Sequence, residues 1–161
     1  MNHSRKQFRI NIGFLLNQPA GTSRDIHFEF KEIELPPELK LFNFKGVAKF
    51  SATRQGILIQ CELHTLAKYE CVKCLEPYSH TLQTNFDELF AFKEEYTTES
   101  GLILSEDGFI DLEPLVWEYL QLEVPIRPLC SLSCKGLCVQ CGENLNSTTC
   151  EHISSSTESI S

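Results

Sequence analysis

Apolar and polar residues alternate along most of the first 92 positions of the chain. In residues 8–16 the apolar side chains take every second position, at Phe8, Ile10, Ile12, Phe14 and Leu16. This alternation predicts a strand with one buried face. The same pattern predicts four further strands, at residues 24–35, 44–53, 57–69 and 80–92. Because strand follows strand without a crossover helix, we expect an antiparallel sheet, and strands of this number and length should curl or partly close.

Turn-forming residues separate the predicted strands. Pro36 and Pro37 should end the second strand, because proline cannot donate a hydrogen bond to a neighbouring strand. The dipeptide Gln55-Gly56 predicts a hairpin turn between the third and fourth strands. Residues 96–107 are rich in Ser, Thr, Gly and acids, and they predict an exposed loop.

One helix is predicted, at residues 111–122. Its apolar residues recur at helical spacing, at Leu112, Leu115, Val116, Tyr119 and Leu120. Asp111 suits the N-cap, because its carboxylate can accept a free amide hydrogen of the first turn. Pro114 is tolerated within that turn, and Pro125 should stop the helix.

Cysteines in metal-ligand spacings follow the helix. Cys138 and Cys141 form a Cys-x-x-Cys unit, and Gly142 after it can adopt the positive φ that such a turn often requires. Two residues between the thiolates let both sulfurs converge on one ion, and tetrahedral zinc needs two such pairs. We therefore predict one structural zinc, with the Cys138 pair as one half of its ligands. The candidate ligands for this zinc are Cys130, Cys134, Cys138 and Cys141, with Cys150 and His152 as the alternative second pair.

A further Cys-x-x-Cys unit, Cys71 and Cys74, lies much earlier in the chain. One pair cannot complete a zinc site, so these thiols either join a distant pair around a second ion or pack in the interior. Together with Lys73 they are also a candidate RNA contact. A thioredoxin-like redox role is disfavoured, because no β-α-β pattern surrounds the pair. Cys61, alone in a strand pattern, is expected in the core.

The predicted fold class is α+β: a mainly antiparallel, curled β-sheet with one helix and a C-terminal Cys-rich zinc-binding segment. We divide the chain into a β-rich domain at residues 1–125, a Cys-rich metal-binding segment at 126–152 and a disordered tail at 153–161. The middle segment is rich in Gly, Ser and Asn, so metal binding would have to supply its folding energy.

The net charge of −8 is unevenly distributed. Residues 1–100 hold 12 Lys and Arg against 13 Asp and Glu, whereas residues 101–161 hold only Arg127 and Lys135 against nine acids. Because nucleic-acid binding needs cations that displace phosphate counterions, we expect any direct RNA contact before residue 100, or through a protein partner.

A modest group of cations lies near three phenylalanines, in and around the third predicted strand. Its members are Lys40, Lys45, Lys49 and Arg54, near Phe42, Phe44 and Phe50. One interpretation is the solvated face of a strand whose aromatic residues lie in the core. The other is an RNA-facing edge, with cations on phosphates and a phenylalanine on a base.

No apolar run approaches the roughly 20 residues of a membrane-spanning helix, so no membrane partner is expected. Residues 1–10 have charges without a following apolar stretch, so no secretory signal is predicted and we expect a cytoplasmic protein. In that reducing compartment the eight cysteines should be thiols or metal ligands.

Three blocks of the sequence resemble the YceD-like family. Residues 71–77 (Cys-Val-Lys-Cys-Leu-Glu-Pro) are similar to its Cys-x-Arg-Cys-Leu signature, and the predicted helix ends at residues 122–125 in its Leu-x-x-Pro. Residues 134–146 are similar to its C-terminal signature almost letter for letter. Lys73 replaces the more usual arginine, and Cys150-Glu151-His152 stands where many members carry Cys-x-Cys. The order and spacing agree over roughly residues 45–152, which makes the set specific.

The resemblance implies a role in the accumulation or maturation of large-subunit ribosomal RNA, without a known catalytic activity. No Ser-His-Asp order, Gly-rich phosphate loop or catalytic carboxylate pair stands out, so we expect neither an enzyme nor a small-molecule substrate. The expected function is a non-catalytic ribosome-biogenesis factor whose partner is large-subunit ribosomal RNA, its precursor or a ribosome assembly protein. The alternatives are a metal-stapled interaction or regulatory adaptor without an RNA role, and a redox enzyme that uses Cys71 and Cys74.

Overall fold

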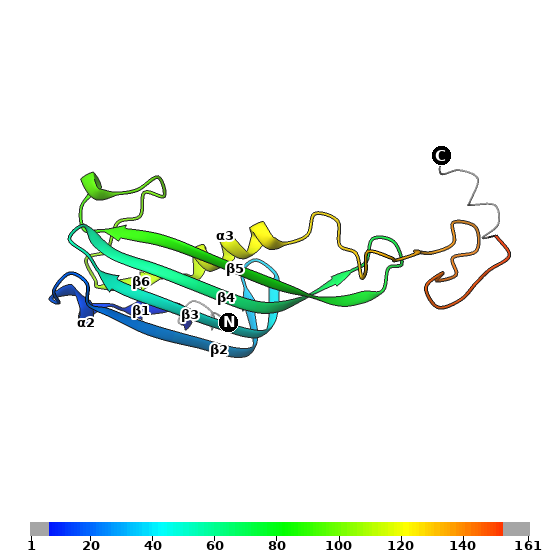
Figure 1. Cartoon of the computed structure of the whole chain (residues 1–161), viewed down its shortest axis with the longest axis horizontal. Helices are drawn as coiled ribbons and strands as arrows, with labels where there is room; N and C mark the ends of the chain where they lie inside the picture. Colours follow the sequence, from blue (N-terminus) through cyan, green and yellow to red (C-terminus); the bar gives the residue numbers. More distant parts are fainter. Residues whose placement is uncertain (1–6, 153–161) are drawn as a thin grey trace. The chain divides into compact units, whose positions relative to one another are not determined.

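The computed structural model describes residues 7–152, which belong to two compact units (Figure 1). Among the described residues, the first unit combines 7–67 with 81–124, and the second combines 68–80 with 125–152. The tip of the hairpin between the fourth and fifth predicted strands belongs to the same unit as the Cys-rich segment. The predicted division into a β-rich domain at residues 1–125 and a metal-binding segment at 126–152 stays a prediction. The predicted disordered tail at residues 153–161 lies outside the described residues.

A four-stranded sheet forms most of the first unit. It consists of β2 (Ser23–Leu35), β3 (Leu39–Ala52), β4 (Gly56–Glu70) and β5 (Pro77–Ala91), hydrogen-bonded in that order. β2 pairs antiparallel with β3, and β3 pairs antiparallel with β4. The predicted antiparallel sheet is therefore confirmed, as are its four main strands. The curling expected of the sheet stays a prediction.

Burial along the strands follows the predicted alternation. In β4 the residues Ile57, Ile59, Cys61 and Leu63 are buried, and the residues between them are more exposed. Gly56 begins this strand after the predicted hairpin turn, and a Cβ atom there would collide with the carbonyl oxygen of Phe90. The turn therefore requires glycine for a steric reason, in addition to its shape.

The first predicted strand is wrong beyond Asn11. The chain forms β1 (Arg9–Asn11), which pairs with β6 (Phe109–Asp111) in a separate antiparallel sheet, and then α2 (Gly13–Leu16). The side chain of Asn11 accepts the backbone N–H of Gly13 at 2.9 Å and turns the chain out of the strand. Ile12 and Leu15, three positions apart, are both buried, so these apolar residues serve a helical turn.

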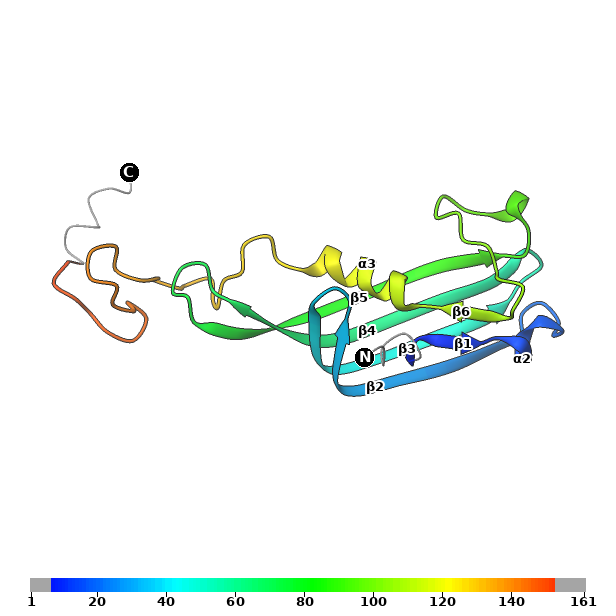
Figure 2. The ribbon, with the colours of Figure 1, turned by 180° about the vertical axis from the view of Figure 1, so that it is seen from behind.

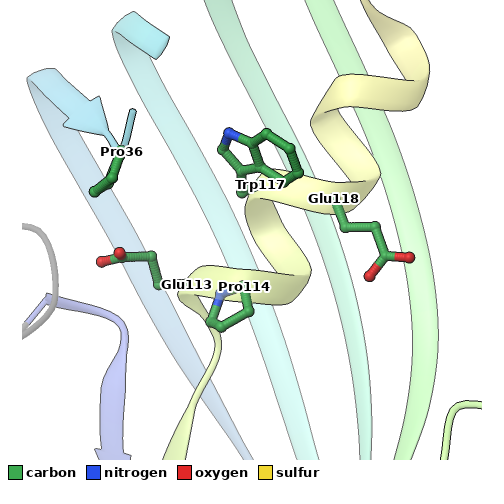
Figure 3. Close-up of a pocket in the computed structure, with 5 residues that line it drawn as sticks. All are labelled: Pro36, Glu113, Pro114, Trp117 and Glu118. Carbon is green, nitrogen blue, oxygen red and sulfur yellow. The ribbon is translucent and has the colours of Figure 1, made fainter. Parts of the chain in front are cut away.

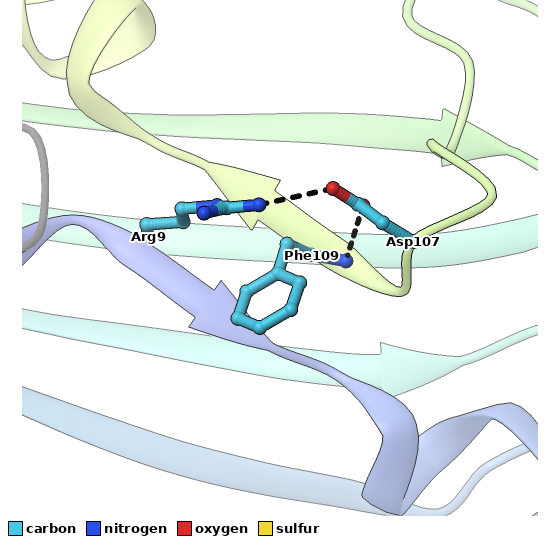
Figure 4. Close-up of polar contacts among 3 residues, drawn as sticks. All are labelled: Arg9, Asp107 and Phe109. Atoms are coloured by element: carbon cyan, nitrogen blue, oxygen red, sulfur yellow. Dashed lines mark hydrogen bonds and ion pairs between the residues drawn. The ribbon is translucent and has the colours of Figure 1, made fainter.

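Arg9 joins β1 to the segment that leads into β6 (Figure 4). Its Nη2 atom lies 3.0 Å from Oδ2 of Asp107, and its guanidinium carbon lies 4.2 Å from the ring centroid of Phe109. The other carboxylate oxygen of Asp107 accepts the backbone N–H of Phe109 at 3.0 Å. That amide hydrogen bond, followed by the contacts to Ser105 and Arg9, lowers the pKa of Asp107. The carboxylate of Asp107 thus binds both the first amide of β6 and the guanidinium of Arg9 in β1.

The predicted helix is present as α3 (Glu113–Glu123). Oδ1 of Asp111 accepts the backbone N–H of Glu113 at 3.0 Å, so Asp111 serves the first turn as predicted. The residue in the N-cap position is nevertheless Leu112, one position later. Within residues 7–152, no helix has the length and apolar character that a membrane crossing requires.

Tyr119 attaches α3 to the sheet, where α3 lies alongside β5 (Figures 1 and 2). Its ring stacks on that of Phe86 with centroids 4.3 Å apart and planes 6° from parallel. Its hydroxyl donates a hydrogen bond of 2.6 Å to the buried carboxylate of Glu88. A carboxylate on a buried strand position is thereby satisfied by the helix that covers it.

Candidate metal centres

The two Cys-x-x-Cys turns of the chain have the same backbone geometry. The N–H of Leu75 bonds to the carbonyl of Cys71 at 2.9 Å, and the N–H of Gly142 bonds to the carbonyl of Cys138 at 2.9 Å. The residue after the second cysteine takes a positive φ in both turns, 61° at Leu75 and 77° at Gly142. The positive φ expected at Gly142 is confirmed. Leu75 adopts the same left-handed conformation despite its Cβ, which indicates that the turn itself demands it.

The first candidate centre joins the early turn to the segment after α3. It comprises Cys71, Cys74, Cys130 and Cys134, whose sulfur atoms all lie within 4.8 Å of one another. The Sγ atoms of Cys71 and Cys134 are 3.7 Å apart, as are those of Cys74 and Cys130. A tetrahedral ion with Zn–S bonds of about 2.3 Å separates its sulfurs by about 3.8 Å, so both distances match edges of such a tetrahedron.

The second candidate centre lies entirely within the C-terminal segment. It comprises Cys138, Cys141, Cys150 and His152, and their ligand atoms also lie within 4.8 Å of one another. Three sulfurs and one imidazole nitrogen are a ligand set that zinc commonly takes. Cys150 and His152, which the sequence analysis gave as the alternative second pair, therefore lie with Cys138 and Cys141.

The structure therefore divides the four cysteines expected around one ion. Cys130 and Cys134 lie with Cys71 and Cys74, whereas Cys138 and Cys141 lie with the later pair. Neighbouring sequence positions suggested the first arrangement, but the hairpin between β4 and β5 brings a complete pair to Cys130 and Cys134. Both groups could hold a metal ion. All eight cysteines are free thiols in the structure.

Electrostatics in both groups favour some thiolates over others. Burial opposes ionisation of Cys71, but backbone N–H groups, that of Cys74 first, lower its pKa to about 6. The backbone N–H groups of Cys141 and Gln140 lower the pKa of Cys138 to about 6. Conversely, the hydrogen bond of Cys130 to Cys134, together with burial, raises the pKa of Cys130 to about 12. Crowded sulfurs thus share protons, and a bound cation would allow all of them to ionise.

Asn146 supports the first centre from outside its four sulfurs. Its Nδ2 atom donates to Sγ of Cys134 at 3.3 Å, and its Oδ1 atom accepts the N–H of Lys135 at 2.8 Å. The hydrogen bond to sulfur leads the contributions that lower the pKa of Cys134. Such outer contacts orient a ligand and hold it as a thiolate. Sequence reasoning did not single out Asn146, although it lies within the C-terminal block that resembles the family signature.

Gly136 brings the C-terminal segment against the early Cys-x-x-Cys turn. Its φ is +76°, and an added Cβ would lie 3.2 Å from the carbonyl oxygen and 3.3 Å from the Cβ of Lys73. The same carbonyl accepts the N–H of Leu137 at 3.1 Å. Lys73, the candidate RNA contact, therefore uses its backbone to hold the second unit together, while its side chain is exposed.

Three of the four cations proposed for RNA contact lie directly opposite acidic residues of the neighbouring strand. In the register of β3 against β2, Lys40 pairs with Glu34, Lys45 with Glu29, and Lys49 with Asp25. All six side chains are exposed, and directly paired residues point to the same face of a sheet. Arg54 is exposed in the turn before β4. The geometry of β3 thus favours the solvated, charge-balanced face over an RNA-facing edge.

Cys61 is buried as expected, and burial raises the pKa of its thiol to about 12.

Comparison with known proteins places these features in a family. Residues 59–159 match the family described as large ribosomal RNA subunit accumulation protein YceD. An uncharacterized protein of Mycobacterium tuberculosis is 32% identical over 105 residues, which are 62% of this chain and 50% of that protein. This chain thus spans about half the length of the mycobacterial relatives it matches.

Two plant proteins carry a descriptive name. Proteins of Arabidopsis thaliana and Zea mays, both named large ribosomal RNA subunit accumulation protein YCED homolog 1, chloroplastic, are 38% and 40% identical over 42 and 43 residues. These matches cover 26% and 27% of this chain, and 13% and 15% of the plant proteins. No solved structure gave a significant match. The family match extends over more than half of the chain and includes every cysteine of both candidate centres. The chain therefore belongs to the YceD family of large ribosomal RNA subunit accumulation proteins.

Proposed function

We propose that this protein is a non-catalytic factor that supports the accumulation or processing of large-subunit ribosomal RNA. The observation that carries this proposal is the family match over residues 59–159, with plant relatives named for that accumulation. The proposed partner is large-subunit ribosomal RNA, its precursor or a ribosome assembly protein, and the proposed location is the cytoplasm. A sheet unit and a Cys-rich unit, without a catalytic constellation among the sequence motifs, suit a binding role.

The proposed cofactor is zinc, bound structurally at both candidate centres. Four sulfurs at the first centre, and three sulfurs with one imidazole at the second, are soft donors in numbers that fill a tetrahedral ion. A filled coordination shell leaves no open position for a substrate, which fits a structural role. It also argues against a redox role for Cys71 and Cys74, because both would be held as ligands.

The second unit needs such ions because it buries few apolar side chains. Its apolar residues Ile126, Leu132 and Val139 are 104%, 98% and 96% exposed. Its buried cluster consists of Cys71, Cys74 and Cys134, with Tyr78 and Leu129 packed against it. Metal–sulfur bonds would therefore supply folding free energy that burial does not.

An adaptor without an RNA role is the second candidate. The acidic composition of residues 101–161 and the exposed apolar side chains of the second unit favour contact with a protein over contact with phosphates. On this view the Cys-rich unit would present Leu132 and Val139 to a partner protein. Lys73 remains the proposed point of RNA contact if contact is direct.

Depletion followed by rescue distinguishes the two candidates. Cells depleted of the protein should show less large-subunit ribosomal RNA and fewer large subunits on sucrose gradients, with small subunits unchanged. The full-length chain and a Cys61→Ala control should restore them, whereas a Cys71→Ser, Cys74→Ser double variant should not. Unchanged large-subunit RNA after depletion, with protein partners still captured, would favour the adaptor.

A further inference from the structure

A cavity of about 520 Å³ lies in the first unit at the start of α3. It is lined by Pro36, Glu113, Pro114, Trp117 and Glu118 (Figure 3). Pro36 comes from the turn after β2, and the other four residues come from the first two turns of the helix. The volume falls within the roughly 300–1,000 Å³ of pockets that bind ligands. None of its lining residues belongs to a candidate metal centre.

Two polar atoms of this cavity are buried without a partner in the described part of the chain. They are Oε2 of Glu113 and Nε1 of Trp117. Glu113 is only 8% exposed, so its carboxylate is largely shielded from water. In Figure 3 the carboxylate of Glu113 and the indole nitrogen of Trp117 both point to the side on which Pro36 lies, while Glu118 extends away. One buried acceptor and one buried donor, neither with a partner, thus lie on the same side of the cavity lining.

The charge of the cavity excludes an anion. The N-terminal end of a helix carries about half a positive charge, whereas Glu113 and Glu118 each carry a full negative one. The first turn also offers little to an anion: the N–H of Glu113 already bonds to Asp111, and Pro114 has no N–H. The field in the cavity is therefore negative, and a cation is the ligand it favours.

The two atoms without a partner, Oε2 of Glu113 and Nε1 of Trp117, indicate which kind of cation fits. A metal ion could satisfy Glu113 but would face the positive edge of the indole N–H of Trp117. An arginine guanidinium can donate to Oε2 of Glu113 and lie flat on an indole face. The backbone carbonyl next to that arginine could accept the N–H of Trp117. Pro36 and Pro114 offer apolar walls to the alkyl part of the side chain.

We propose that this cavity binds an arginine side chain within a segment of a partner protein. This site is independent of the proposed ribosomal role, because it uses no residue of either metal centre. It requires a carboxylate at position 113 and an acceptor beside the arginine. A neutral side chain of the same shape should therefore not replace the arginine.

The test uses the full-length protein and the peptide acetyl-Gly-Ala-Arg-Ala-Gly-amide. Trp117 is the only tryptophan of the chain, so its fluorescence and its indole N–H signal in NMR report on this cavity alone. The arginine peptide should shift both signals in a saturable manner. The matched peptide with citrulline, which is neutral and nearly isosteric, should bind at least about tenfold more weakly, because a buried charge pair is lost.

Variants separate the site from general surface charge. Glu113→Gln should weaken the arginine peptide at least about tenfold, and Glu118→Gln, an exposed position, should weaken it about two- to threefold. Glu94→Gln, an exposed acid elsewhere in the first unit, should leave binding unchanged. If Glu113→Gln does not fold, the citrulline comparison and Glu118→Gln still decide the matter.

Three outcomes would overturn the proposal. They are equal binding of the arginine and citrulline peptides, unchanged binding by a folded Glu113→Gln variant, and an indole signal that does not move. A further arm examines the chain's own cations, because Phe8, whose carbonyl accepts the N–H of Leu112, is only two residues from Lys6. If the peptide binds only after Arg5→Gln and Lys6→Gln, the cavity serves this chain's own segment and the proposal for a partner fails.

Discussion

The sulfur of Cys71 lies 3.7 Å from the sulfur of Cys134, although 63 positions separate the two residues. This distance is too long for a covalent S–S bond of about 2.05 Å and matches the edge of a thiolate tetrahedron. The hairpin between β4 and β5 supplies one half of that tetrahedron, and the chain after α3 supplies the other. Two distant parts of the sequence therefore form one candidate centre.

We expect gently purified protein to contain two equivalents of zinc. Cys71→Ser should reduce the content to about one equivalent, and Cys138→Ser should do the same, because each removes one ligand of a different tetrahedral site. Cys61→Ala should leave two. Elemental analysis with counting of reactive thiols measures this. One equivalent in the wild-type chain that Cys71→Ser does not affect would contradict the first centre.

Removal of metal should unfold the second unit and spare the sheet. A chelator would take away the ions that hold the Cys-rich segment, whereas β2 to β4 keep their own buried apolar residues. Metal binding should also weaken as pH falls, because protons compete for the thiolates. Hydrogen exchange, followed segment by segment, would show loss of protection confined to residues 68–80 and 125–152. Equal loss in the strands would mean that the sheet depends on metal.

Gly142→Ala should weaken the second centre and leave the first intact. The φ of +77° at Gly142 costs a residue with a Cβ roughly 1–2 kcal/mol, while open space around the position adds no clash. Gly136→Ala should weaken zinc binding more than Gly142→Ala does, because its added Cβ would also press on the backbone of Lys73. Competition with a zinc indicator, applied to each variant, ranks the two effects. A reversed ranking would show that the close approach of Gly136 is easily relaxed.

Tyr119→Phe should destabilise the first unit by about 1 kcal/mol, since it leaves the buried carboxylate of Glu88 without its donor. The hydrogen bond to Glu88, with burial, raises the pKa of Tyr119 from 10.0 to about 12. A raised pKa means that the folded state favours the neutral phenol. This contribution is fully present below about pH 10 and is lost as pH rises towards 12.

Urea unfolding at several pH values measures this effect. The difference in unfolding free energy between wild type and Tyr119→Phe should shrink between pH 10 and 12. A difference that stays constant across this range would mean that the hydroxyl contributes packing alone. Phe86→Leu provides a comparison, because it removes the stacked ring and keeps the hydrogen bond.

Gly56→Ala should destabilise the sheet severely, by more than about 3 kcal/mol, because a Cβ at this position would overlap the backbone carbonyl of Phe90. Backbone atoms on a paired strand cannot move aside as a flexible side chain can. Gly101→Ala, with nothing within 4 Å of its Cβ, should cost only the strain of its φ of +65°. Thermal unfolding compares the two, and similar melting temperatures would contradict the steric argument.

Local pattern by itself determined the long strands, the hairpin turn at Gly56 and the helix after Asp111. These elements depend on the side-chain period and on turn residues, which neighbouring positions contain in full. The same reasoning failed at residues 12–16, because a short apolar run fits a helical turn as well as a strand, and Asn11 decides between them through one hydrogen bond.

Only the tertiary structure decided which cysteines meet and which cations are balanced. Strand pairing places Lys45 opposite Glu29, and the β4–β5 hairpin brings Cys71 beside Cys134. The cavity at Trp117 likewise needs Pro36, which lies 81 positions earlier in the chain. Such contacts depend on how distant segments are brought together, and the local sequence around each residue does not contain that information.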